Sequence, residues 1–207
     1  MWTFARIAAM SKQNLKGTKM EARNEVCERE HDFALVLAGA VGLPEGAEEA
    51  LFEAGCDDAT LSVRSGRAYL TFSRIAPTLK AAMLSAIQDV RKAKIGLDVL
   101  RVDDCNLVTQ SDIARRISRT RQLVHQYING ERGPGGFPSP ACHICDESPL
   151  WYWCEVSYWL WQNDMIKQEV LREAEDVAVI NAVLELRHQR KSAPNLAEEI
   201  MQSIGVN

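Results

Sequence analysis

The sequence predicts an α+β protein made of three successive parts, and three observations lead to this prediction. Residues 31–104 alternate short strand-like runs with two runs of helical periodicity. Residues 105–163 contain two short helix signals, then a Gly/Pro-rich stretch and an aromatic run. Residues 164–207 carry helical periodicity almost throughout. Residues 1–30 show neither pattern, and we expect a flexible leader there.

The composition is that of a globular protein. The chain has 207 residues, a formal net charge of −4, 46% hydrophobic residues and 25% charged residues, so it can bury a core. No apolar run is long enough to cross a bilayer, and the basic start lacks the apolar run of a signal peptide. The six cysteines are scattered, so no disulfide framework is needed. We therefore expect a cytoplasmic protein without membrane contact.

The first part begins with a strand and a helix. "DFALVLAGA" is a short apolar run that ends in small residues, which is typical of a buried strand. "LPEGAEEALFEAG" has Pro44 near its start, acidic residues in its first turn and Gly55 at its end, which are helix start and stop signals. "ATLSVRSGRAYLTFS" reads as two strands that turn at Ser65 and Gly66.

A second helix and a last strand complete this part. "APTLKAAMLSAIQDVRKAKIG" places five apolar side chains on one helical face, namely Leu79, Met83, Ala86, Ile87 and Val90, before Gly96 closes the helix. "LDVLRVD" reads as a strand. The order β-α-β-β-α-β is that of the ferredoxin-like fold. With no phosphate-binding glycine motif and no catalytic histidine in it, the part is interpreted as a packing or oligomerisation module.

The second part predicts a helix-turn-helix. Thr109 and Asp112 are spaced like a capping box, and Ile113, Ala114 and Ile117 form the inward face of the helix they start. Ser118 and Arg119 leave room only for a tight turn. Thr120 can cap a second helix, "RQLVHQYIN", whose inward residues are Leu123, Val124, Tyr127 and Ile128, and which ends at Asn129-Gly130.

The outward residues of the second helix have the chemistry of DNA recognition. Arginine can bond guanine, and glutamine adenine, in the major groove. We expect Arg121, Gln122, His125 and Gln126 to read bases, and Arg115, Arg119, Thr120 and Arg132 to hold phosphates. From Thr109 to Arg132 there are five arginines against two acids, a charge of +3 on an otherwise acidic chain. The alternative is that these arginines only solvate an exposed face.

A resemblance supports this interpretation. "GFPSP" (residues 136–140), followed by "LWYWCEVSYWL", resembles the winged helices of the excisionase and MerR-like group, in which a GFPxP wing precedes an aromatic strand and an acidic residue that starts a helix. Glu155 would be that residue. "ALFEAGCDDATLSVRSGRAYLTFSR" resembles the N-terminal part of bacterial DNA-binding proteins with the same winged helix behind it. The resemblance implies sequence-specific binding of double-stranded DNA by a small bacterial regulator.

The wing region also contains residues that ligate metals in other proteins. Cys142 and Cys145 have a zinc-ligand spacing, and His143 and Cys154 lie nearby. No second pair of this spacing follows, so we predict no metal and no cofactor, with zinc binding or redox sensing as the alternative. The tryptophans Trp151, Trp153 and Trp159 are interpreted as core anchors, with base stacking as the alternative.

The third part predicts a long amphipathic helix. Its apolar stripe consists of Val170, Ala174, Val177, Ile180 and Leu184, and is widened by Leu171, Ala178 and Leu186. This face must be buried, either on the winged helix or against a second copy, and a homodimer would suit a regulator. Residues 195–207 are expected to form one more short helix.

Together these patterns favour a transcriptional regulator, and in particular a repressor. The alternative is an antitoxin or defence-system adaptor that mainly binds a protein partner and uses DNA binding for autoregulation. An enzyme is not predicted, because no nucleophile stands with a base and no paired carboxylates share a motif.

Overall fold

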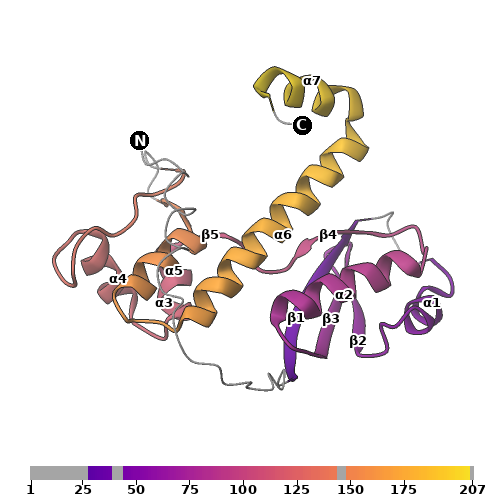
Figure 1. Cartoon of the computed structure of the whole chain (residues 1–207), viewed down its shortest axis with the longest axis horizontal. Coiled ribbons are helices and arrows are strands. Elements are labelled where there is room, and N and C mark those ends of the chain that lie inside the picture. Colours follow the sequence, from indigo (N-terminus) through magenta and orange to yellow (C-terminus); the bar gives the residue numbers. More distant parts are fainter. Residues whose placement is uncertain (1–27, 39–43, 144–147, 206–207) are drawn as a thin grey trace, which may run out of the picture.

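The computed structural model describes residues 28–38, 44–143 and 148–205. Figure 1 shows the sheet and its helices at one end of the molecule, a group of short helices at the other, and the long helix α6 (Gln168–Ser192) reaching across both. We call these ends the sheet region and the helical region. Most of the expected leader, residues 1–27, lies outside the described residues. The first strand begins at Arg29, three residues before the start of the predicted strand at Asp32.

The sheet region has the predicted order of elements. These are β1 (Arg29–Ala38), α1 (Ala47–Glu53), β2 (Ala59–Arg64), β3 (Arg67–Ala76), α2 (Leu79–Lys92) and β4 (Asp98–Val102). The strands lie in the order β2-β3-β1-β4, and each neighbouring pair is antiparallel. The predicted α+β class is therefore confirmed. Helix α1 begins at Ala47, three residues after Pro44, and the end of the first predicted strand, residues 39 and 40, lies outside the described residues.

The predicted turn between β2 and β3 is confirmed. Ser65 and Gly66 both have left-handed φ angles, 49° and 74°, and Arg64 pairs with Arg67 across the turn. Two left-handed residues in a two-residue loop match the twist of the flanking strands. The turn therefore fixes the register of the hairpin.

One side of the sheet carries the larger core. Leu35, Leu70 and Phe72 on the central strands pack with Met83 and Ala86 of α2, and each of these residues is at most 1% exposed. Ile87 and Val90 are buried as well, and Leu79 packs against this core from its edge. The apolar face predicted for α2 is thus confirmed.

The helical region has its own, smaller core. Its elements are β5 (Leu107–Val108), α3 (Gln110–Arg116), α4 (Arg121–Ile128), β6 (Trp151–Tyr152) and α5 (Trp153–Gln162). β5 and β6 pair antiparallel, and Val108, Ile113, Val124, Trp151 and Val156 are each at most 2% exposed. This cluster fixes the positions of the three helices relative to one another.

Helix α5 begins earlier than expected because its first backbone N–H groups donate hydrogen bonds to Asn106, which is distant in the sequence. The N–H of Trp153 donates to the backbone oxygen of Asn106 at 2.6 Å, and the N–H of Cys154 to the Asn106 side-chain oxygen at 3.1 Å. Glu155, expected to start the helix, instead lies in its first turn. Helix N–H groups need such partners wherever the helix begins.

The third part is two helices, α6 (Gln168–Ser192) and α7 (Pro194–Ile204). Five residues of α6 are buried: Leu171, Ala174, Val177, Ile180 and Leu184. Val170 and Leu186, predicted for the buried face, are 36% and 42% exposed, because they lie toward other sides of the helix. None of the helices in the described part is both long and apolar enough to cross a membrane.

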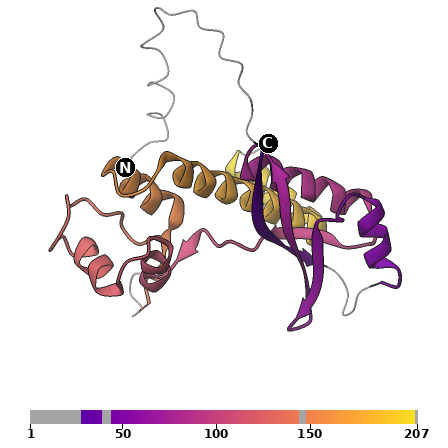
Figure 2. The same cartoon turned by 90° about the horizontal axis from the view of Figure 1, so that it is seen from below.

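Helix α6 packs on both regions. Val177, Ile180 and Leu184 belong to the core of the sheet region, and Ala174 belongs to the core of the helical region. Figure 2 shows α6 running from the short helices to the sheet. There its Asn181 side chain accepts from the N–H of Val102 at 2.8 Å and donates to the oxygen of Asp104 at 3.0 Å. An edge strand needs such partners for its outward backbone groups.

Candidate nucleic-acid interface

The capping box at the start of α3 is confirmed. Thr109 Oγ1 accepts from the N–H of Asp112 at 3.1 Å, and Asp112 Oδ2 accepts from the N–H of Thr109 at 3.0 Å. The Thr109 hydroxyl also donates to Asp112 at 2.7 Å. These bonds from Thr109 favour the carboxylate and hold the pKa of Asp112 below its ordinary value. Both residues therefore fix where α3 begins.

A tight turn sets α4 against α3. Ser118 is left-handed with φ 52°, and the N–H of Arg119 donates to the oxygen of Ala114 at 2.8 Å. Thr120 Oγ1 accepts from the N–H of Leu123 at 3.2 Å and caps α4, as predicted. The Gln110 side chain donates to the backbone oxygen of Arg121 at 2.8 Å. The first turns of both helices are thereby joined.

The outward face of α4 is polar. Arg121, Gln122 and His125 are exposed, whereas Gln126 is half-buried and lies at the margin of this face. Asn129, which sequence reasoning missed, is exposed on the same face one turn after His125. Its amide nitrogen lies 3.0 Å from His125 Nε2. An amide N–H donates, so this contact fits the tautomer of His125 that carries its hydrogen on Nδ1.

The five arginines of this segment are not equivalent. Arg116 bonds Asp104, and its guanidinium lies 4.9 Å from the ring centroid of Trp153, so it is used within the molecule. Arg115 is 77% exposed and pairs with Asp112 at 2.7 Å. The side chains of the remaining three have no ion-pair or hydrogen-bond partner among the described residues, and all are exposed: Arg119, Arg121 and Arg132. The positive charge of these three is available to an outside ligand.

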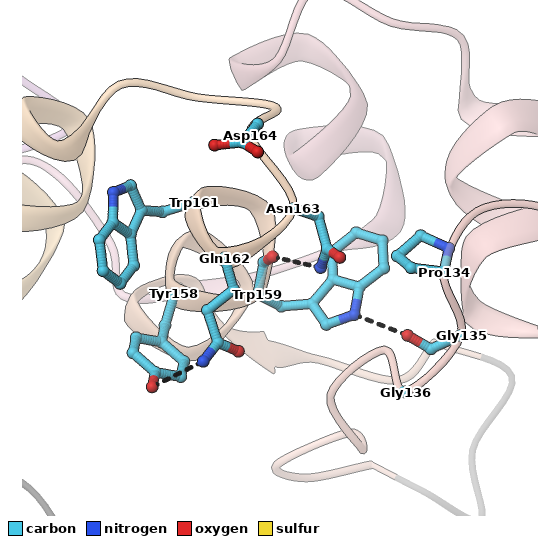
Figure 3. A pocket seen from close by; sticks show the side chains of 9 residues that line it. All are labelled: Pro134, Gly135, Gly136, Tyr158, Trp159, Trp161, Gln162, Asn163 and Asp164. Atoms are coloured by element: carbon cyan, nitrogen blue, oxygen red, sulfur yellow. Dashed lines mark hydrogen bonds between the residues drawn. The ribbon is translucent and has the colours of Figure 1, made fainter.

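Residues 131–141, which we call the wing loop, are held by two tryptophans, Trp151 on β6 and Trp159 on α5. Trp159 Nε1 donates to the oxygen of Gly135 at 2.9 Å, as Figure 3 shows, and Trp151 Nε1 donates to the oxygen of Pro138 at 3.1 Å. The Phe137 ring packs against both, with centroids 5.0 Å from Trp159 and 6.4 Å from Trp151. With Trp153, both tryptophans are at most 6% exposed, so their predicted role as core anchors is confirmed.

The path of the wing loop requires glycine at one position. Gly133 has φ 86°, and a Cβ placed there would lie 3.0 Å from the Tyr127 ring. No L side chain fits that conformation and that space without strain. The close approach of loop and α4 therefore depends on Gly133. Farther along, Ala141 and Cys142 pair with Leu150, which makes the start of a hairpin-like excursion.

A shallow hollow lies beside the wing loop. It has a volume of about 760 Å³ and is lined by Pro134, Gly135, Gly136, Tyr158, Trp159, Trp161, Gln162, Asn163 and Asp164. Figure 3 shows the Trp159 ring forming the wall toward the loop. Tyr158 and Trp161, whose centroids are 6.0 Å apart, continue the surface along α5.

The cysteines near the wing loop do not form a metal site in the part of the chain that is described. No group of three or more His, Cys, Asp and Glu side chains lies together there. Cys145, the second member of the zinc-like spacing, lies outside the described residues. Cys142 and Cys154 are half-buried free thiols.

Comparison of the chain with protein-family models, with curated proteins and with solved structures found no match. The function therefore has to be argued from the site itself.

Proposed function

We propose that this protein is a sequence-specific, double-stranded DNA-binding transcriptional regulator, most simply a cytoplasmic repressor. The observation that carries the proposal is the outward face of α4. Arg121 and Gln122 project from the first turn of a capped helix, and neither side chain contributes to the core or bonds another described residue. A helix-turn-helix protein reads base edges with that part of its second helix. The proposal assigns no catalytic reaction and no cofactor.

Each part of the region has a role in this proposal. Helix α4 enters the major groove, where Arg121 can bond guanine and Gln122 adenine, while His125 and Gln126 reach neighbouring base edges. Arg119 and the hydroxyl group of Thr120 donate hydrogen bonds to one stretch of phosphates. Arg115 binds the same phosphates after its exposed ion pair with Asp112 breaks. The wing loop, fixed by Trp151 and Trp159, brings Arg132 to the backbone as the wing of a winged helix.

The sheet region serves assembly in this proposal. Its antiparallel order β2-β3-β1-β4, with α1 and α2 as the connections, is consistent with the ferredoxin-like fold. The polar side chains that come together there, around Arg74, bond one another.

Two arginine variants test the proposal. A binding site is first selected from a random duplex pool, and affinities are then measured across a range of salt concentrations. Arg121→Ala should cost about 1–3 kcal/mol on the selected site and much less on unrelated DNA. Arg132→Ala should weaken all sequences alike and lower the salt slope by about one. The matched control is Arg67→Ala, which removes an exposed arginine from the β2–β3 hairpin and should change neither affinity.

Specific outcomes would contradict the proposal. Selection that enriches no sequence even at low salt would remove sequence-specific binding. If Arg121→Ala left the affinity for the selected site unchanged, α4 would not be the helix that recognises bases. A loss in Arg132→Ala that is confined to one base position would contradict the wing assignment.

The exposed stripe of α7 favours a second candidate function. Leu196, Ile200 and Ile204 are 56%, 49% and 67% exposed, and side chains of this kind suit a protein partner. In this alternative the chain is an antitoxin or defence-system adaptor that binds DNA only to regulate its own synthesis. A neighbouring toxin-like gene, and its product co-purifying at fixed stoichiometry, would favour it.

A further inference from the structure

Helix α6 carries a second apolar stripe that belongs to neither core cluster of the described residues. Val179, Val183 and Leu186, which we call the outer stripe, are 63%, 61% and 42% exposed. Their spacing of four and three residues places them on one side of the helix. At about 100° per residue, the centre of that side is about 125° around the helix from the centre of the buried stripe of Val177, Ile180 and Leu184. A helix that is apolar on two separate sides is typical of one packed on both.

Charged residues flank the outer stripe symmetrically. Glu175 lies four residues before Val179, and Arg190 lies four residues after Leu186. Both are exposed, Arg190 to 55%. The Glu175 side chain has no ion-pair or hydrogen-bond partner among the described residues, and Arg190 makes only a long contact of 3.7 Å with Glu198. The stripe is thus bordered by Glu175 at its N-terminal end, with the exposed Arg172 three residues farther out, and by Arg190 at its C-terminal end.

We propose that the outer stripe binds a second copy of this chain, with the two α6 helices antiparallel about a two-fold axis near Val183. In this arrangement Val179 of each copy meets Leu186 of the other, and the two Val183 side chains meet at the axis. A two-fold interface of this kind uses the same surface on both copies. All six side chains of the two stripes leave water together, which is the main driving force.

The charges select the antiparallel direction. Parallel helices would place Glu175 against Glu175 and Arg190 against Arg190 of the second copy. Antiparallel helices place Glu175 against Arg190 at both ends of the stripe. Exposed ion pairs contribute little each, about 0.2–1 kcal/mol, but like charges in the same places are unfavourable. The two directions therefore differ at two charge contacts of the dimer, which are repulsive in the parallel arrangement and attractive in the antiparallel one.

The arrangement also has a consequence for DNA, which rests on the proposed function. Ala174, where α6 packs on the helical region, would lie opposite residue 191 of the second copy. A separation of 17 residues is about 26 Å at a rise of 1.5 Å per residue. The two helical regions extend outward from these points, at opposite ends of the paired helices. Two half-sites one turn of B-DNA apart require a spacing of about 34–36 Å between the two α4 helices, which is larger than this separation along α6.

The interface is tested by the mass of the full chain in solution without DNA. Wild-type protein at micromolar concentration should have twice the chain mass of 23.2 kDa by light scattering. Val183→Glu places two like charges at the axis and should raise the dissociation constant at least a hundredfold. Val63→Glu, at a valine of β2 that is 52% exposed, is the matched control and should leave the dimer unchanged.

A pair of charge reversals tests the direction. Glu175→Arg and Arg190→Glu should each weaken the dimer about tenfold in sedimentation equilibrium, and the double variant should recover wild-type association. Circular dichroism of each variant shows whether the helix itself is intact. Single variants without effect, or a double variant that does not recover, would overturn the antiparallel arrangement.

The remaining outcomes are equally decisive. A wild-type chain that is monomeric at about 100 μM, or a dimer that Val183→Glu leaves intact, would overturn the interface. A monomer that still binds a single selected half-site would leave the proposed function standing. A dimer that binds DNA without sequence preference would contradict the proposed function but would leave the proposed interface standing.

Discussion

The sheet region and the helical region use arginine in opposite ways. In the sheet region Arg74 is 8% exposed, and it donates to Asp58, Asp89, Ser85 and the backbone oxygen of Gly55. In the helical region Arg119, Arg121 and Arg132 are exposed and have no side-chain partner among the described residues. The same side chain is thus a structural connector at one end of the molecule and an unused donor at the other.

The bonding partners of the arginines, and not their number, decide how much charge a surface offers to an outside ligand. The hydrogen bond to Asp58 raises the pKa of Arg74 and outweighs the opposing effect of burial, so this guanidinium stays charged and engaged. Charge counting along residues 109–132 included Arg116, which the structure shows bonded to Asp104. The available charge of the segment is therefore smaller and more localised than its composition indicates.

The largest expected effect on stability comes from replacing Arg74, the structural connector of the sheet region. Arg74→Met should destabilise the protein by about 3–5 kcal/mol, because Asp58 and Asp89 would lose the cation that compensates their partial burial. Urea unfolding at neutral pH measures the change. Arg67→Met, an exposed arginine on the same strand, is the control and should shift the free energy of unfolding by less than about 0.5 kcal/mol. Equal changes in the free energy of unfolding for the two variants would show that the buried contacts of Arg74 add no more stability than an exposed arginine does.

The next effect concerns the wing loop. Gly133→Ala should cost about 2–3 kcal/mol, because the new Cβ adds a clash with the Tyr127 ring to the strain of a left-handed residue. Gly136→Ala is the matched control, since Gly136 is also left-handed but has open space around it, and should cost about 1 kcal/mol. Thermal unfolding and affinity for unrelated DNA both measure the change. Identical values for the two variants would contradict the close approach.

The smallest expected effect on stability concerns Asp112, at the start of α3, the helix that supports α4. The depressed pKa of Asp112 stabilises the fold above the ordinary aspartate value of 3.8, and this contribution is lost as the pH falls through the folded pKa. Asp112→Asn should be less stable than wild type by up to about 1 kcal/mol at pH 7, and the gap should narrow below pH 4. The control is Asp57→Asn, at an exposed aspartate. A gap that does not depend on pH would contradict the role of the carboxylate.

Sequence reasoning predicted what is encoded locally. The caps at Thr109 and Thr120, the turn at Ser65-Gly66 and the buried face of α2 each depend on residues within a few positions of one another. It missed the contacts made by residues far apart in the chain, such as Asn106 capping α5 and Asn181 bonding β4. No periodicity carries such a signal. Asn129 was within reach, since it lies one turn after His125 on the polar face.

Helix α6 has a thermodynamic consequence that follows from its two packing partners. Helix α6 completes the core of the sheet region with Val177, Ile180 and Leu184, and that of the helical region with Ala174. If either region unfolds, α6 therefore exposes apolar side chains and loses part of the packing that holds it on the other region. We therefore expect the two regions to unfold as one cooperative unit. By linkage, a ligand that binds only the helical region raises the free energy of unfolding of the distant sheet as well.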